Sequence, residues 1–382
     1  MKNTIIQQRR AKLETTANSA VPAAPGDGLA IKDVKGWIVH EPVSKRGYTV
    51  IRIQTVSGLI GYGECAPIWN AEFAIAKSAI LGLPVTSFDV ALSLLSKCTT
   101  ARAALNIAML DVVGKACKAP VFQVLGGPTR HKARALTQLS GDTNEALVVS
   151  MNRASAAGYK AFIVPIPAVG SRNQGQAYVV AVKKRLEALR TAGGANVDFV
   201  LDATGQLTPG DAQMISNEIQ KLHVLWFNEP CTATSLGAFR KIAGESVTPV
   251  GLGRTATEGS TIQDLLREDA VDIIRPDIGL NGITQIRKMA AIAEVYYVAA
   301  GPVHNGGPIG TAAALHLAAS IPNFFIQEIP FPEAPEDQAM RLSLTAEPVE
   351  IIKDGFAVLP TGPGLGINVN EKNLEKYKEA TL

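Results

Sequence analysis

The sequence lacks several features that mark common protein classes. Its four cysteines, Cys65, Cys98, Cys117 and Cys231, are widely spaced and form no CxxC pair. Neither a disulfide framework nor a zinc cluster is therefore predicted, and a reducing cytoplasm is the expected location. No run of about 18 apolar residues is present, so no membrane helix is predicted either.

An excess of charge of one sign is also missing. The formal net charge is +3, and 47% of the residues are hydrophobic and 19% charged, as in ordinary globular proteins. Nucleic acid and membranes are therefore not expected partners, and a small organic substrate is. Arg9-Arg10 is reminiscent of a twin-arginine export signal, but no apolar run of signal length follows, so export is not predicted.

The chain length and the local sequence pattern predict four segments. A chain of 382 residues exceeds the size of one hydrophobic core, so two structural units are expected. The first unit contains the alternating segment TVIRIQT, a Ser57-Gly58 turn and a return strand LIGYGE, followed by a helix over residues 101–118. The predicted segments are a flexible N-terminal arm (1–28), an α+β domain (29–131), a β/α domain (132–342) and a C-terminal segment that packs on the α+β domain (343–382).

The β/α domain alternates short apolar strands with amphipathic helices. The eight predicted strands are RALTQLS, AFIVPI, VDFVLDA, VLWFNEP, TPVGLG, VDIIRP, YYVAAG and FFIQEI. Eight β/α units in succession predict a closed TIM-type barrel, with a doubly wound open sheet as the structural alternative.

Polar residues follow the predicted strands, where TIM barrels carry their chemistry. Asp202, Asn228 and Arg254 recur at intervals of 26 positions after the third, fourth and fifth strands. The other polar strand-end residues are Asp277, His304 and Glu328. Because such ends meet at one face of a barrel, these six side chains are expected to form one site.

Several phrases of the chain carry a family resemblance. They are GYKAF, VDFVLDATGQLTPGDA, LWFNEP, VDIIRPDIGLNGITQIRKMAAIAE, VHNGGPIGTAAALHLAASIPNFFIQE and DVVGKACKAPVFQVLGGP. Together they resemble the mandelate racemase and muconate lactonizing enzyme group of the enolase superfamily. The resemblance implies that the α+β domain caps the barrel, that the protein is a homo-oligomer, and that it removes a proton next to a carboxylate. The enolate is then held by Mg²⁺ on three strand-end carboxylates, without an organic cofactor.

The resemblance also implies roles for three residues. Asp277 and His304 match a dyad in which the aspartate fixes the imidazole tautomer and the histidine acts as base. Glu328 matches the acid that hydrogen-bonds the enolate, a role that needs a protonated carboxyl group. The structural alternatives are a packing histidine at 304 and a buried structural acceptor at 328.

The expected metal ligands depart from the family pattern. Only Asp202 keeps a carboxylate, because Asn228 and Arg254 stand where the family has two glutamates. Mg²⁺ prefers anionic oxygen ligands and is repelled by a guanidinium, so tight Mg²⁺ binding is not expected. Arg254 is instead predicted to pair with Asp202 and to bind the substrate carboxylate. The alternative is an inert salt bridge in a decayed site.

The second predicted barrel strand also departs from the family pattern. Ile163 and Pro165 stand where many relatives have a Lys-x-Lys pair, so a second base for racemisation is missing. A single histidine favours dehydration of a hydroxylated sugar acid. A racemase, epimerase or cycloisomerase, and a non-catalytic binding protein, remain the alternatives.

Loops of the capping domain are expected to cover the barrel mouth and to select the substrate. The candidate contacts with the small carboxylic acid are His40, Lys45, Arg46, Trp69 and Asn70, although each is also an ordinary type of surface loop residue.

Overall fold

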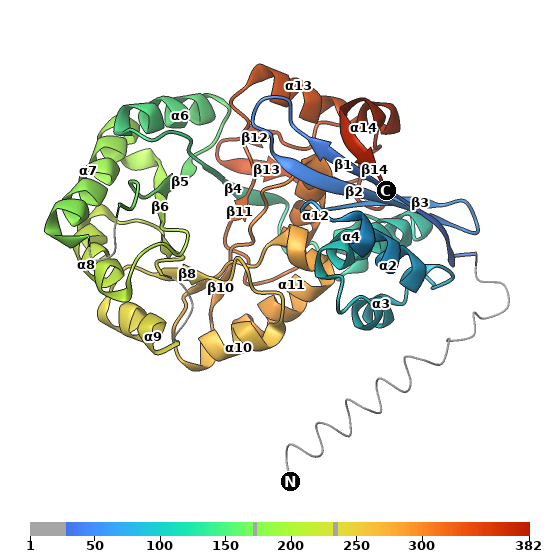
Figure 1. Cartoon of the computed structure of the whole chain (residues 1–382), viewed down its shortest axis with the longest axis horizontal. Coiled ribbons are helices and arrows are strands. Elements are labelled where there is room, and N and C mark those ends of the chain that lie inside the picture. Colours follow the sequence, from blue (N-terminus) through green and yellow to red (C-terminus); the bar gives the residue numbers. More distant parts are fainter. Residues whose placement is uncertain (1–27, 171–173, 232–235) are drawn as a thin grey trace, which may run out of the picture.

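The computed structural model describes residues 28–170, 174–231 and 236–382, which form a barrel with a smaller α+β domain against one side (Figure 1). The flexible arm predicted over residues 1–28 lies, apart from Gly28, outside the described residues. None of the described helices is long and apolar enough to cross a membrane. The predicted cytoplasmic location stays a prediction.

The capping domain is built on a four-stranded antiparallel sheet in the order β14-β1-β2-β3. Its strands are β1 (Ile31–His40), β2 (Gly47–Thr55), β3 (Ile60–Cys65) and β14 (Lys378–Thr381). Its helices are α2 (Asn70–Ile80), α3 (Phe88–Leu94), α4 (Thr99–Ala116) and α5 (Val121–Val124). Gly61 and Gly63 let β3 lie directly on α4, because a Cβ there would stand 2.3 Å from the Ala108 carbonyl oxygen and 1.9 Å from that of Ala104.

All eight predicted barrel strands are present and parallel, which confirms the TIM-type barrel. They are β4 (Lys132–Gln138), β5 (Ala161–Pro165), β6 (Asp198–Asp202), β7 (Phe227–Asn228), β8 (Val250–Leu252), β9 (Ile273–Ile274), β10 (Ala299–Ala300) and β11 (Gln327–Glu328). Strands β4 to β10 pair in sequence order and β11 pairs with β4, while a bridge between Ala300 and Phe324 joins the last two units.

Helices surround the barrel strands on the outside (Figure 1). They are α6 (Asn144–Ala156), α7 (Gly175–Gly193), α8 (Pro209–Ile219), α9 (Leu236–Glu245), α10 (Gly259–Arg267), α11 (Ile278–Val295) and α12 (Pro308–Ala318). Helix α11 is interrupted at Gly282, whose φ of +67° brings it against α4 of the capping domain. There Asn106 donates to Thr284 Oγ1 at 2.8 Å and accepts from Thr284 N at 3.0 Å. The interruption therefore serves the contact between the two domains.

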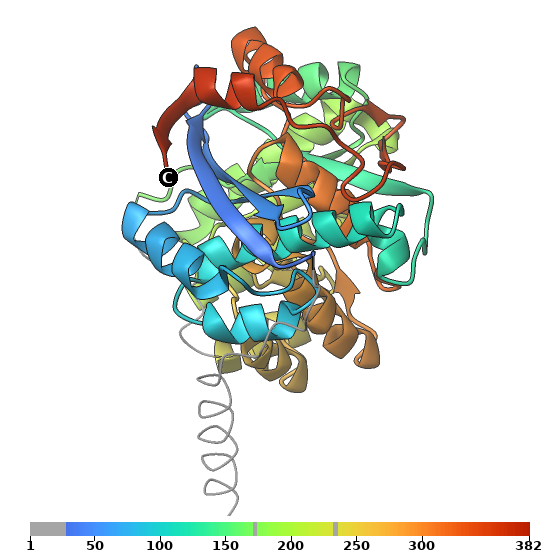
Figure 2. The same cartoon turned by 90° about the vertical axis from the view of Figure 1, so that its right-hand side faces the viewer.

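The C-terminal segment contacts both domains. After α13 (Pro335–Ser343) the hairpin β12 (Ile352–Lys353) and β13 (Phe356–Val358) adds to the barrel, with β13 antiparallel to β4. Helix α14 (Glu371–Tyr377) then leads to β14, which pairs with β1 of the cap. In Figure 2 this red segment runs along the edge of the blue cap strands.

The barrel interior consists of an apolar layer with a polar layer above it. The apolar layer includes Leu136, Val200, Trp226, Ile273 and Ile326, all buried in one cluster. Side chains alternate along a strand, so the residue two positions later points to the same interior. Those residues are Gln138, Asp202, Asn228, Arg275 and Glu328. The fold therefore places polar and charged groups directly on a hydrophobic floor.

Candidate active site

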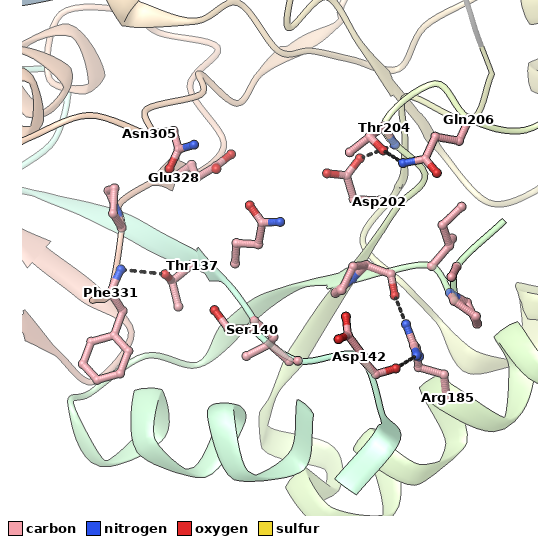
Figure 3. A pocket seen from close by; sticks show the side chains of 18 of the residues that line it. Thr137, Ser140, Asp142, Arg185, Asp202, Thr204, Gln206, Asn305, Glu328 and Phe331 are labelled. Carbon is pink, nitrogen blue, oxygen red and sulfur yellow. Dashed lines mark hydrogen bonds between the residues drawn. The ribbon is translucent and has the colours of Figure 1, made fainter. Parts of the chain in front are cut away.

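A cavity of about 550 Å³ opens at the carboxyl ends of the barrel strands. Its walls come from the loops after β4, β5 and β6, from the region around Glu328, and from Arg46 of the cap. In Figure 3, Asn305 and Glu328 lie across the cavity from Asp202, Thr204 and Gln206. Most of these groups are polar, which suits a hydrophilic ligand.

Asp202 is the centre of a hydrogen-bond network at the cavity wall. Its Oδ1 accepts from Asn228 Nδ2 at 2.9 Å and from the Thr204 amide at 3.0 Å. Its Oδ2 accepts from Arg254 Nη2 at 2.9 Å, so the predicted ion pair is present. Asn228 Oδ1 in turn accepts from Trp226 Nε1 at 3.1 Å. Of the three expected metal-ligand positions, the side chains of Asn228 and Arg254 therefore both bind Asp202.

The backbone of Arg254 is held by Glu229, the residue that follows β7, and its guanidinium remains charged. Glu229, whose φ is +42°, accepts the amides of Gly253 and Arg254 at 2.9 Å each through Oε1. Burial lowers the pKa of Arg254, but the carboxylates of Asp202, Glu328 and Glu229 together raise it above the usual arginine value. Its Nε is buried without a hydrogen-bond partner, while 26% of the side chain is exposed. Arg254 contacts the cavity residue Asp202 but is not itself among the residues that line the cavity.

Arg275 forms a second cationic centre beneath the cavity. It is fully buried and donates through Nη2 to Glu328 Oε2 at 2.6 Å and through Nη1 to the Gly301 carbonyl. Its Nε donates to Asn228 Oδ1 at 3.2 Å. Glu328 was expected as a protonated acid, which stays a prediction, and in the structure its carboxyl group pairs with the Arg275 guanidinium. The reason is that the arginine occupies the interior position beside it.

The predicted hydrogen bond between Asp277 and His304 is absent from the structure. Asp277 caps α11 by accepting the Gly279 amide at 2.6 Å, and burial raises its pKa to about 6. His304 Nε2 instead lies 2.9 Å from the Gly307 carbonyl, and burial lowers the pKa of this imidazole to about 4. Each side chain is held by its own loop. The neighbouring Asn305 lines the cavity, whereas His304 faces the interface with the cap.

His304 lies in a buried polar cluster that joins barrel and cap. A Cβ added to Gly310 would stand 2.3 Å from the His304 ring and 2.6 Å from Glu64 Oε1, which places these two groups side by side. Glu64 Oε1 accepts the Gly307 amide, whereas Glu64 Oε2 and the Tyr48 hydroxyl have no hydrogen-bond partner. Burial raises the pKa of Glu64 to about 7. A protonated Glu64 is thus the form that this interface favours below about pH 7.

The raised pKa of Glu64 predicts that the stability of the protein depends on pH. Because the folded pKa is raised from 4.5 to about 7, the stability that the protonated group provides at low pH is lost as pH rises through that window. We expect the difference in unfolding free energy, Glu64→Gln minus wild type, to increase by about 2–3 kcal/mol from about pH 5 to about pH 8. Urea unfolding across this range measures the difference. Glu294→Gln, at an exposed position of α11, is the control, and parallel curves for wild type and Glu64→Gln would contradict the assignment.

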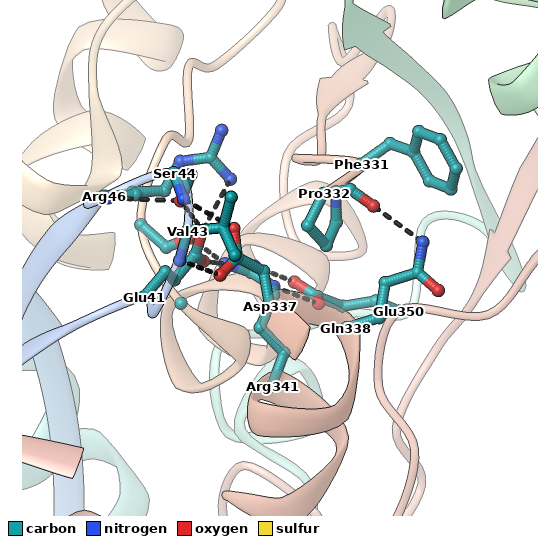
Figure 4. Close-up of polar contacts among 12 residues, drawn as sticks. Glu41, Val43, Ser44, Arg46, Phe331, Pro332, Asp337, Gln338, Arg341 and Glu350 are labelled. Carbon is teal, nitrogen blue, oxygen red and sulfur yellow. Dashed lines mark hydrogen bonds and ion pairs between the residues drawn. The ribbon is translucent and has the colours of Figure 1, made fainter. Parts of the chain in front are cut away.

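Arg46 is the predicted cap residue that reaches the cavity. Its loop is held by Asp337 of α13, which accepts the amides of Val43 at 2.8 Å and Ser44 at 2.9 Å (Figure 4). Arg46 Nη1 is buried without a hydrogen-bond partner and lies 3.8 Å from Glu41 Oε2. The guanidinium therefore has a donor available for a ligand.

The other predicted cap residues do not line the cavity. His40 Nδ1 lies 2.9 Å from a carboxylate oxygen of β14, and Lys45 Nζ donates to a carbonyl of its own loop at 2.7 Å. Trp69 is 83% exposed, and Asn70 begins α2 as an exposed residue. These loops are anchored by the cap's own contacts. Binding of a ligand to these four residues stays a prediction.

The sequence reasoning missed several residues of the site. Arg275 does not close its strand, but its position two after the apolar Ile273 places it inside the barrel. Thr137, Gln206 and Asn305 also line the cavity, although Gln206 and Asn305 stand inside phrases that carry the family resemblance. Strict alternation along each strand is the signal that finds Arg275.

Two family descriptions match the chain. Residues 37–126 match the N-terminal domain of mandelate racemase and muconate lactonizing enzyme, and residues 146–373 match the enolase C-terminal domain-like family. The chain is 28% identical over 292 residues to a D-galactonate dehydratase of Ralstonia pickettii, covering 74% of each chain. It is 27% identical to a D-mannonate dehydratase of Sphingomonas sp., covering 88% of this chain and 93% of the relative.

Solved structures show the same fold. A mandelate racemase/muconate lactonizing enzyme-like protein from Rubrobacter xylanophilus superposes with a TM-score of 0.83 at 21% identity, covering 92% of this chain and 98% of that one. The capped barrel is therefore shared over nearly the whole chain.

Proposed function

The chain belongs to the mandelate racemase and muconate lactonizing enzyme group of the enolase superfamily, and from that membership we propose that it is a lyase that dehydrates a sugar acid. Relatives that are dehydratases of D-galactonate and D-mannonate support this class of substrate. The observation that carries the proposal is the Asp202–Arg254 pair beside a polar cavity at the barrel mouth. The pair holds a fixed cation against Asp202, and we assign recognition of the substrate carboxylate to this cation.

The donor set does not fit the Mg²⁺ that the family implies. Asp202 already accepts hydrogen bonds from Thr204, Asn228 and Arg254, and the last two supply an amide and a guanidinium in place of carboxylates. Within the described ranges no group of three or more His, Cys, Asp or Glu residues could hold a metal ion. A cation near a divalent ion repels it in a partly buried site. Arg254 is therefore proposed to take the electrostatic role that the metal has in the family.

Arg254 suits the recognition of a carboxylate that gains charge. Planar guanidinium groups bind carboxylates through parallel hydrogen bonds, and Arg254 uses only Nη2 for Asp202. When the α-proton leaves, the electrons of the C–H bond move into the carboxylate and form an enediolate. Arg254 would stabilise this negative charge without reorganisation. Arg46 of the cap lines the cavity together with Asp202, the partner of Arg254, and can assist.

Glu328 is the group that the geometry favours as the proton acceptor. It lines the cavity, whereas His304 is turned toward the cap and bonded to a carbonyl. Glu328 would take the proton from the carbon next to the substrate carboxylate. Collapse of the enediolate would then break the bond to the 3-hydroxyl group, which leaves as water with a proton returned by Glu328. The resulting enol becomes a 2-keto-3-deoxy acid.

The rest of the cavity suits the hydroxyl groups of such a substrate. Thr137, Thr204, Gln206 and Asn305 provide hydroxyl and amide groups that both donate and accept hydrogen bonds. A racemase of the same superfamily would need a second acid or base on the opposite face of the substrate, where β5 ends in Pro165. Dehydration is therefore the reaction that the lining favours.

Replacing Arg254 by methionine tests this assignment. The variant is expected to bind D-galactonate or D-mannonate about 10–100-fold more weakly, because a charge-assisted hydrogen-bonded pair is lost. Calorimetry in the presence of a chelator measures the affinity, and dehydration is followed as 2-keto acid formation. The control is Arg153→Met, which removes an exposed arginine paired with Glu333 outside the cavity. Equal affinity of wild type and Arg254→Met, or activity only with added Mg²⁺, would overturn the metal-free proposal.

A further inference from the structure

Arg275 is a buried arginine inside the barrel. It follows Ile273 by two positions, so it points to the interior above the apolar layer, and none of its side chain is exposed. Its guanidinium stands 5.1 Å from the centre of the Trp226 ring, a cation–π contact with the residue below Asn228. A charged group in this position needs several partners, because burial of an unpaired charge is costly.

The partners of Arg275 are the residues that shape the site. Its three donors reach Asn228 Oδ1 at 3.2 Å, Glu328 Oε2 at 2.6 Å and the Gly301 carbonyl. These bonds join three strands of the barrel, β7, β10 and β11, near their carboxyl ends. The planar, rigid fork of an arginine suits this arrangement. Arg275 thereby fixes where the carboxylate of Glu328 can lie.

Asn228 also depends on Arg275. Its amide oxygen accepts from Trp226 and Arg275, while its amide nitrogen donates to Asp202. A glutamate at this position has no N–H to donate to Asp202, so two carboxylates would face each other. The oxygen of residue 228 that would bind an ion is thus already engaged by a cation. The neutral amide of Asn228 can thus accept from the buried Arg275 and donate to Asp202 at the same time.

We infer that Arg275 is the positioning residue of this site, a buried cation that fixes Asn228 and Glu328 and excludes a divalent ion independently of Arg254. The inference deepens the proposed metal-free function and rests on it. It implies that restoring carboxylates at positions 228 and 254 does not by itself rebuild a metal site. Arg275 must also be removed.

The test is a Mg²⁺ titration of chelator-treated proteins by calorimetry. The variants are N228E/R254E, N228E/R254E/R275M and the matched control N228E/R254E/R185M. Arg185 is also buried and lines the cavity, but it donates to Asn144 and to the carbonyls of Asp142 and Pro165. Its removal changes the net charge equally. We expect the variant without Arg275 to bind Mg²⁺ at least about 10-fold more tightly than the other two variants.

Each outcome bears on a separate claim. Equal binding by N228E/R254E and N228E/R254E/R275M overturns the role of Arg275 and leaves the metal-free proposal standing. Equal gains on removal of Arg185 and Arg275 reduce the effect to net charge and also overturn it, as does a folded R275M variant that binds no Mg²⁺. Binding by wild type overturns the metal-free function itself. Folding is checked by near-ultraviolet circular dichroism, and R275Q replaces R275M if the latter does not fold.

Discussion

Arg341→Met is expected to lower the unfolding free energy by about 3–5 kcal/mol, because it removes the cation that pairs with the buried Glu41 and the largely buried Glu350. Arg341 is 2% exposed and binds Glu41 of the cap and Glu350 of the C-terminal segment. It also donates to the Gly306 carbonyl at 2.9 Å, next to the His304 loop. Figure 4 shows these groups gathered between cap and barrel.

The electrostatics of this cluster explain the size of the effect. Burial raises the pKa of Glu350, but Arg341 outweighs that contribution and lowers it overall, with help from the Thr311 hydroxyl at 2.6 Å. Removing the arginine therefore leaves anions that must take up protons or stay buried unpaired. Either response stabilises the unfolded chain relative to the folded one.

Urea unfolding of wild type and Arg341→Met measures the loss. The control is Arg153→Met, which breaks a surface pair with Glu333 and is expected to cost less than about 1 kcal/mol. The combination E41Q/R341M/E350Q should recover most of the loss, because both carboxylates that pair with Arg341 are then replaced by neutral amides. A loss below about 1 kcal/mol for Arg341→Met alone would show that the cluster is hydrated and does not hold the domains together.

The barrel could be predicted from sequence because its signals are local. Each strand is a short apolar run, and helices such as the one containing Met289 show regular burial on one face. The Asp202–Arg254 pair was also predictable, since both residues follow neighbouring strands at equal spacing. The polar layer above Trp226 follows from the alternation of side chains along a strand.

The orientation of His304 could not be predicted, because it depends on contacts between distant segments. Its ring lies beside Glu64 of β3, and the intervening Gly306, Gly307 and Gly310 leave room for this approach. A sequence motif records which residue follows a strand but not which of two interfaces its ring faces. The same limit applies to Arg46, which reaches the cavity while its neighbour Lys45 bonds to its own loop.

Exchange of the substrate's α-proton with solvent distinguishes the two candidate bases. If Glu328 takes the proton, Glu328→Gln should lower the exchange rate by about 10²–10⁴-fold, the range typical of a lost general base. The substitution keeps the size of the side chain and one oxygen acceptor for Arg275. Binding of the sugar acid should change far less. Nuclear magnetic resonance of D-galactonate or D-mannonate in D₂O measures deuterium incorporation at carbon 2.

His304→Gln is the variant that separates the Glu328 assignment from the predicted His304–Asp277 dyad. Glu328 as base requires that His304→Gln keeps a measurable exchange rate, since the imidazole is buried and bonded to Gly307. The dyad requires that exchange disappears in this variant and survives in Glu328→Gln. His316→Gln, at a fully buried histidine whose Nδ1 accepts the Phe122 amide, controls for the loss of a packed imidazole. Loss of exchange in His304→Gln alone would mean that the ring turns into the cavity when substrate binds, which would return proton abstraction to the dyad.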